Sequence, residues 1–132
     1  MLILRKGRGL RVLEVKQSPG KGRGVFTLKP YRKGDIIEKA PVIIIPKSDL
    51  RAIMVTVMVD YFFQWGREGA VALGYGSLFN HSYKPNAEFI LKREDTCIHF
   101  RALRNIAPGE EVTINYKGKP DRKLPVPFEV VE

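Results

Sequence analysis

The sequence predicts a mostly β domain of short strands with one or two short helical turns. Glycine, proline and asparagine recur about every ten residues, and this spacing favours short strands over long helices. Between them lie runs of valine and isoleucine, whose branched side chains pack well in sheets. The length of 132 residues and the mass of 15.0 kDa fit one domain, so we expect residues 1–132 to fold as a single unit.

The first half of the chain contains four stretches that are predicted as strands. They are residues 10–16, 25–28, 36–38 and 42–45. Ser18-Pro19-Gly20 turns the chain after the first stretch, and Lys33-Gly34-Asp35 turns it before the third. The fourth stretch is β-branched and lies between Pro41 and Pro46, which predicts a short buried strand.

A helix and four further strands are predicted in the second half of the chain. Ser48 and Asp49 are suited to cap a helix that continues through residues 50–53. The valine-rich residues 55–59 fit a strand as well as a helix, so their structure stays open at this point. The further predicted strands are residues 61–65, 87–92, 96–102 and 112–116.

Three chemically notable side chains receive a structural interpretation. Cys97 and His99 stand two residues apart on the predicted strand 96–102, so they share one face of it. No further ligands stand at a spacing suited to a metal site that includes this pair. Trp65 is predicted to pack in the core or at an interface, as large aromatic side chains usually do.

The positive charge of the chain is concentrated at its amino-terminal end. The formal net charge is +9 and the sequence pI is near 9.9. Residues 1–34 contain ten lysines and arginines but only one acid, Glu14, so they account for the whole excess. This basic N-terminal third predicts an acidic or nucleic-acid partner for that end of the chain.

Several classes of protein are excluded by composition. Cys97 is the only cysteine, so the chain has neither an internal disulfide nor a multi-thiolate zinc site. The longest apolar stretch, residues 52–59, is far short of the about 20 residues that a membrane span needs. We therefore expect no membrane contact and an intracellular location, cytoplasmic or, in a eukaryote, nuclear.

Three segments carry residue types suited to ligand binding or catalysis. They are Gly22-Arg23-Gly24, Phe79-Asn-His-Ser-Tyr-Lys-Pro-Asn86 and Gly109-Glu-Glu-Val-Thr-Ile-Asn-Tyr116. The glycines of the first let a backbone approach a ligand, although such a pair more often marks a turn. Asn80 and His81 offer the donors and acceptors that the edge of a heterocyclic ring requires. The adjacent carboxylates Glu110 and Glu111 are predicted to be solvated.

In this order and spacing, the three segments resemble the SET domain, the fold of protein-lysine methyltransferases. Each segment alone is weak evidence for this family, whereas the three segments in this order are specific for it. The resemblance covers about residues 12–117 and leaves residues 118–132 as a C-terminal tail. It implies small curved β-sheets around a pseudoknot, in which the segment of Asn80 and His81 crosses the last strand.

The resemblance also implies roles for individual residues. The backbone of Gly22, Arg23 and Gly24 is expected to line a site for S-adenosylmethionine. Asn80 and His81 are expected to hydrogen-bond this cofactor. Tyr116 matches the catalytic tyrosine of the family. The aromatic residues that we assign to a lysine channel are Tyr61, Tyr75 and Phe128.

One departure from the family pattern concerns zinc. Many members carry a cysteine after the Asn-His-Ser sequence and a cysteine cluster downstream that binds zinc. Here Tyr83 stands at that position and no cysteine follows Cys97. We therefore expect a minimal, zinc-free version of the domain with no metal site.

The implied reaction agrees with elementary chemistry. Methyl transfer from a sulfonium is an in-line displacement, which gains much of its rate from positioning. The attacking lysine must be neutral, although its unperturbed pKa is about 10.4. An aromatic channel beside a cationic sulfonium disfavours the ammonium form. Tyr116 would then orient the reacting groups, and the proton would leave to water.

The leading hypothesis is S-adenosylmethionine-dependent methyl transfer to a lysine side chain of a protein substrate. The alternative is a non-catalytic protein-binding module with the same fold, whose basic N-terminal third makes nonspecific contacts with nucleic acid. An uncovered edge strand would in addition allow a homodimer.

Overall fold

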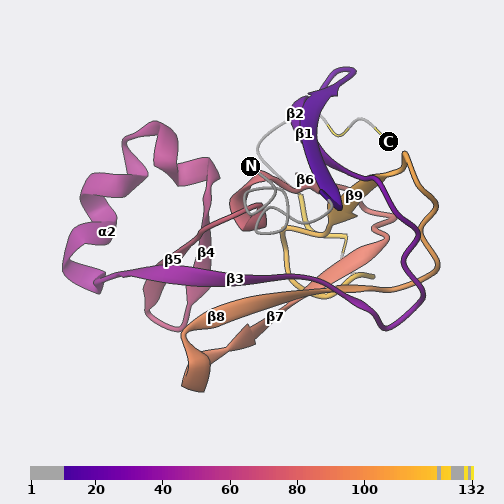
Figure 1. Ribbon diagram of the computed structural model, residues 1–132. Coiled ribbons are helices and arrows are strands. Elements are labelled where there is room, and N and C mark those ends of the chain that lie inside the picture. Colours follow the sequence, from indigo (N-terminus) through magenta and orange to yellow (C-terminus); the bar gives the residue numbers. More distant parts are fainter. Residues whose placement is uncertain (1–10, 122, 126–129, 131) are drawn as a thin grey trace, which may run out of the picture.

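The computed structural model describes residues 11–121, 123–125, 130 and 132. The strands of this part of the chain form two sheets (Figure 1). They are β1 (Leu13–Ser18), β2 (Gly22–Thr27), β3 (Ile36–Ile45), β4 (Phe62–Trp65), β5 (Glu68–Ala72), β6 (Asn80–His81), β7 (Ala87–Lys92), β8 (Cys97–Ala102) and β9 (Glu111–Ile114). The helical elements are α2 (Lys47–Met54) and the 3-10 turns η1 (Val57–Asp60), η2 (Gly76–Leu78) and η3 (Arg93–Asp95). The prediction of a mostly β fold with short helical turns is confirmed.

The four-stranded sheet has the order β1-β2-β9-β6. β1 and β2 form an antiparallel hairpin, which projects from one side of the molecule in Figure 1. β9 pairs antiparallel with β2 and parallel with β6, so the last strand lies between segments from the beginning and the middle of the chain. This sheet therefore brings together all three of the segments with candidate site residues.

The five-stranded sheet has the order β4-β5-β3-β8-β7, with the ten-residue strand β3 at its centre. The prediction of two separate strands, residues 36–38 and 42–45, is wrong because Pro41 lies inside β3. Residues 36–41 pair with β8, and residues 42–45 pair with β5. Pro41 stands where the partner changes, and its carbonyl accepts a hydrogen bond from the backbone N–H of Leu73 over 2.9 Å. Proline has no N–H to donate, but its carbonyl still accepts, and this acceptor is what the neighbouring chain uses at the change of partner.

The helix α2 is longer than predicted and begins differently. Its N-cap is Pro46, and no side chain makes a capping hydrogen bond, so the predicted caps Ser48 and Asp49 are wrong. The valine-rich segment that follows is neither a continued helix nor a strand. The Thr56 hydroxyl accepts a hydrogen bond from the backbone N–H of Met58 over 3.2 Å and starts the short turn η1. The β-branched Val55 and Thr56 would lose rotamer freedom in a helix, which favours the end of α2 at Met54.

The hairpin β4–β5 was only half predicted. Gly66 turns the chain with a φ of +63°, as its position after the predicted strand 61–65 suggests. The strand β5 was missed because Gly69 and Ala70 have little strand propensity. A side chain at Gly69 would meet the side chains of Leu50 and Phe62 at 2.9 Å, so close packing explains the glycine.

The hairpin β7–β8 agrees closely with the prediction. Its strands pair in register from Ala87 opposite Ala102 to Lys92 opposite Cys97. Cys97 and His99 are both half-buried and alternate with the buried Ile98 and Phe100 of β8, so the predicted shared face is confirmed.

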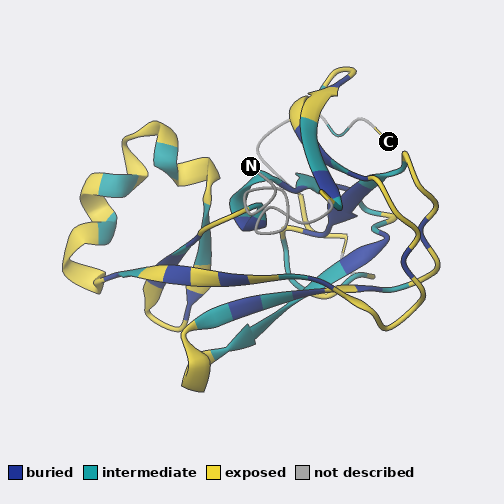
Figure 2. Cartoon of the chain, in the orientation of Figure 1, coloured by how far each residue is buried: buried dark blue, intermediate teal, exposed yellow. Residues whose placement is uncertain are grey.

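The hydrophobic core draws buried residues from both sheets (Figure 2). Phe79 and Phe100 are almost completely buried, and their ring centroids are 4.6 Å apart. Trp65 is also buried, in agreement with its predicted structural role. In contrast, α2 contributes no buried residue and is mostly exposed in Figure 2.

The segment after β6 crosses the last strand, as the resemblance implied. Asn80 pairs with Thr113 in parallel register. The Asn86 side chain donates to the carbonyl of Glu111 over 2.8 Å and accepts from the N–H of Thr113 over 2.9 Å. β9 ends at Ile114 rather than at the predicted Tyr116. Tyr116 consequently leaves the sheet at the point where the segments cross.

Candidate active site

Two cavities meet beside this crossing. The smaller has a volume of about 400 Å³ and the larger a volume of about 720 Å³. Four residues line both of them: Asp60, Tyr61, Ser77 and Tyr116. Two ligands that enter from separate sides would therefore face each other at Tyr116.

The smaller cavity contains most of the residues predicted to bind a cofactor. Its lining includes Gly22, Arg23, Asn80 and His81. Gly24 lies behind this lining, where an added side-chain carbon would be 2.7 Å from Nδ2 of Asn80 and closer still to Oε2 of Glu111. The glycine is required there by close approach rather than by a turn.

Asn80 is fixed by hydrogen bonds from its amide group. Its Nδ2 donates to the backbone carbonyl of Arg23 over 3.1 Å and to Oε2 of Glu111 over 2.6 Å. The first bond ties the strand β6 to the glycine segment of β2, and the second ties it to β9. The wall of the smaller cavity is thus held by the side chain of one of its own predicted ligand-binding residues.

His81 connects the smaller cavity to Tyr116. The backbone N–H of Tyr116 donates to Nδ1 of His81 over 3.0 Å, and the two ring centroids are 5.2 Å apart. Burial lowers the pKa of the His81 imidazole, and the charges of Lys117 and Lys21 act in the same direction against that of Glu132. The imidazole is therefore neutral at neutral pH, with Nδ1 as an acceptor.

The Tyr116 hydroxyl lies at the junction of the cavities and donates to the carbonyl of Phe79 over 2.7 Å. Burial raises the pKa of Tyr116 to about 12, and the neighbouring Tyr61, Asp60 and Glu111 act in the same direction. The phenol therefore keeps its proton at neutral pH. Since its proton points to Phe79, the oxygen acts as an acceptor toward other groups rather than as a base.

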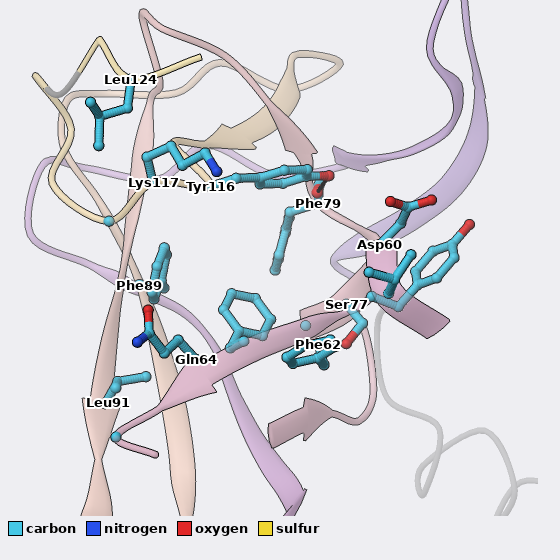
Figure 3. A pocket seen from close by; sticks show the side chains of 16 residues that line it. Asp60, Phe62, Gln64, Ser77, Phe79, Phe89, Leu91, Tyr116, Lys117 and Leu124 are labelled. Atoms are coloured by element: carbon cyan, nitrogen blue, oxygen red, sulfur yellow. Dashed lines mark hydrogen bonds between the residues drawn. The ribbon is translucent and has the colours of Figure 1, made fainter. Parts of the chain in front are cut away.

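Aromatic side chains form much of the wall of the larger cavity. Phe62, Phe79 and Phe89 point into it together with Leu91, and Tyr116 closes one side (Figure 3). Asp60 stands at the same end of the cavity as the Tyr116 hydroxyl (Figure 3). An apolar wall with a carboxylate at the junction suits a long aliphatic side chain that ends in an amine.

The comparison with known proteins identifies the fold that carries this site. Residues 22–117 match the family model described as the SET domain. The chain belongs to the SET domain family. It is thus a methyltransferase of the protein-lysine class.

The relatives of this SET domain have consistent names. The chain is 36% identical over 107 residues to the histone-lysine N-methyltransferase of Schizosaccharomyces pombe described as specific for H3 lysine-37, covering 79% of this chain and 72% of the relative. It is 26% identical over 122 residues to the histone-lysine N-methyltransferase Suv4-20 of Caenorhabditis elegans, covering 88% of this chain and 42% of that protein. A crystal structure of a candidate histone methyltransferase from Plasmodium falciparum superimposes with a TM-score of 0.65 at 29% identity, covering 82% of this chain and 95% of that one.

The candidate lysine-channel residues of the SET domain lie in different places. Tyr61 lines both cavities and is 37% exposed. Tyr75 is not among the lining residues of either, and its hydroxyl donates to the carbonyl of Leu13 over 3.3 Å. Phe128 lies outside the described residues.

Two acidic residues of the site were missed by sequence reasoning. Asp60 directly precedes Tyr61, but nothing in its local pattern separates it from a surface acid. The prediction that Glu110 and Glu111 are both solvated is half wrong. Glu110 caps the backbone N–H of Ala107 at the surface, whereas the side chain of Glu111 is 14% exposed and hydrogen-bonded inside the site. Glu110 precedes β9 and Glu111 is its first residue, so their different environments follow from where the strand begins.

The structure provides no metal cluster within the residues that it describes, because His, Cys, Asp and Glu side chains do not gather in threes. Among the same residues, no helix is long and apolar enough to cross a membrane.

Proposed function

We propose that the protein transfers a methyl group from S-adenosylmethionine to the side-chain amine of a lysine in a histone. The observation that carries this proposal is the meeting of two unlike cavities at Tyr116. The polar smaller cavity suits a nucleoside-containing cofactor, and the aromatic larger cavity suits a lysine side chain. The histone as acceptor follows the names of the two relatives.

The residues of the smaller cavity fit S-adenosylmethionine. Gly22 and Arg23 line this cavity, and the absence of a side chain at Gly24 lets Asn80 and Glu111 pack directly behind them. Asn80 and His81 supply side-chain polar groups to the same wall. When bound, this cofactor supplies an activated methyl group on its sulfonium.

The residues of the larger cavity prepare the acceptor. The aromatic wall excludes water and disfavours the ammonium form of a buried lysine, so that the amine loses its proton before it attacks. Tyr116 does not accept that proton, because a phenol with a pKa of about 12 is already protonated at neutral pH. Its oxygen instead accepts a hydrogen bond and orients the amine.

The experiment that tests this function uses the purified chain, S-adenosylmethionine with a labelled methyl group, and each of the core histones in turn. We expect labelled N-methyl-lysine, identified by mass spectrometry, and saturable binding of the cofactor in calorimetry. Tyr31→Phe serves as the control for Tyr116→Phe, because Tyr31 is a buried tyrosine outside both cavities. Binding of the cofactor without methylation of any histone would reject histone as the acceptor. Failure to bind the cofactor would reject the proposed function as a whole. The comparisons give no support to the alternative of a non-catalytic module.

A further inference from the structure

Glu111, the first residue of β9, contacts the β1–β2 hairpin and β6 beneath the wall of the smaller cavity. The Ser18 hydroxyl at the end of β1 donates to Oε1 over 2.7 Å, and Nζ of Lys21 lies 3.7 Å from the same oxygen. Nδ2 of Asn80 on β6 donates to Oε2 over 2.6 Å. The side chain of Glu111 is only 14% exposed, and both of its carboxylate oxygens have partners in the protein. Two of these partners, Lys21 and Asn80, also line the smaller cavity.

These contacts determine which way the amide of Asn80 faces. An amide group has two N–H donors and one carbonyl acceptor, whereas a carboxylate only accepts. A rotated amide would bring the Oδ1 oxygen of Asn80 against the carboxylate oxygen of Glu111 and against the carbonyl of Arg23. Because Nδ2 serves both acceptors, Oδ1 remains as the side-chain atom with which Asn80 meets a ligand.

The position of Gly24 shows that this arrangement leaves no free space. A carbon added to Gly24 would collide with the carboxylate of Glu111 and with the amide of Asn80. The three residues are therefore packed in direct contact, so the carboxylate of Glu111 stays against the amide of Asn80.

We propose that Glu111 is a positioning residue that fixes Asn80 as a hydrogen-bond acceptor, so that the smaller cavity selects ligands with an amine at this point. The identity of the ligand rests on the proposed function. S-adenosylmethionine carries two amino groups that donate hydrogen bonds, and S-adenosylhomocysteine carries the same two without the sulfonium charge. Glu111 acts through Asn80 and does not itself line the cavity.

The test compares Glu111→Gln with the matched variant Glu110→Gln, whose carboxylate binds Arg104 and Ala107 at the surface. A glutamine at residue 111 can donate as well as accept, so this position no longer excludes the rotated amide of Asn80, and only the carbonyl of Arg23 still favours the original orientation. We expect about tenfold weaker binding of S-adenosylmethionine in calorimetry and a higher KM for it, with kcat at saturation within about threefold. Glu110→Gln should bind within about twofold of the unsubstituted protein.

S-adenosylhomocysteine separates orientation from bulk charge. If Glu111 acts by orienting Asn80, both ligands lose affinity by the same factor, because they share the amino groups. A loss confined to the cationic S-adenosylmethionine would overturn the proposal in favour of simple charge attraction. Unchanged binding of both ligands by Glu111→Gln would also overturn it.

Two further readouts keep the proposal testable. A cooperative thermal transition establishes that Glu111→Gln is folded. If it is not, Asn80→Ala takes its place, because it removes the acceptor Oδ1 that Glu111 is proposed to hold toward the ligand; we expect it to weaken both ligands equally, and unchanged binding would overturn the proposal. Failure of the unsubstituted protein to bind either ligand would instead reject the proposed function, and this inference with it.

Discussion

The backbone N–H of Tyr116 donates a hydrogen bond to Nδ1 of His81 over 3.0 Å. This bond requires a neutral imidazole, because a protonated Nδ1 has no lone pair to accept with. The position of Tyr116 at the junction of the two cavities therefore depends on the protonation state of a residue on another strand.

The first prediction is that stability falls at acid pH through His81. Burial lowers the pKa of His81 in the folded protein, so the unfolded chain binds the proton more readily. The neutral imidazole therefore contributes its full share to the free energy of unfolding when the pH is above about 6.5, the pKa in the unfolded chain. This share is lost as the pH falls from that value to the lower pKa of the folded protein. Thermal melting between neutral and acid pH should show the decline. His81→Gln should lose part of this dependence and His99→Gln should keep it; an identical profile for both variants would contradict the prediction.

The second prediction concerns the hydroxyl of Tyr116. Tyr116→Phe should lower kcat by about 10²-fold, since a positioned hydrogen-bonding group at the reacting atoms is lost. The pH dependence of kcat should keep its shape, because a phenol with a pKa of about 12 does not titrate near neutrality. Steady-state kinetics on a confirmed substrate measures both quantities. An altered pH profile with unchanged kcat would show that Tyr116 has a different role.

The third prediction contrasts two glycines. Gly24→Ala should abolish or strongly weaken cofactor binding, because the methyl group collides with Glu111 and Asn80. Gly34→Ala meets no atom within 4 Å but forces a φ of +93° on alanine, so it should cost about 1–2 kcal/mol of stability and leave binding intact. Calorimetry and urea unfolding measure the two effects. Equal loss of binding in both variants would refute the contact explanation.

The fourth prediction concerns the core beneath the site. Phe100 is fully buried against Phe79, whose carbonyl accepts the hydrogen bond from Tyr116. Phe100→Ala should lower the free energy of unfolding by about 3–5 kcal/mol. Ile43→Ala, at a side chain that is 56% exposed on β3, should change it by less than about 0.5 kcal/mol. Urea denaturation tests the pair, and similar midpoints would contradict this account of the core.

Local patterns predicted the hairpin β7–β8 well, because alternation and a polar turn determine such a structure within a few residues. They failed at β5, whose small residues form a strand only because β3 and β4 pair with it on both sides. They also failed at Pro41, which is tolerated by a change of partner strand that no local pattern reveals. Tertiary pairing therefore decided the elements that propensity left weak.

The candidate site shows the same division. The segments of Asn80 and Tyr116 were recognised by their resemblance to the SET domain, and the structure places them side by side. The different environments of Glu110 and Glu111 were not foreseen, because adjacent acids look alike until the direction of each side chain is known. A nucleic-acid partner of the basic N-terminal third and a homodimer stay predictions.

The parallel pairing of β6 with β9 has a consequence for the order of folding. His81 and Tyr116 are 35 residues apart in the sequence, and the hairpin β7–β8 lies between them. Closing such a long loop costs entropy before its contacts form, so hairpins with local contacts form earlier. We expect both cavities to be completed late, after the hairpins. A ligand that fits them would then slow unfolding and raise the melting temperature without accelerating the early steps of folding.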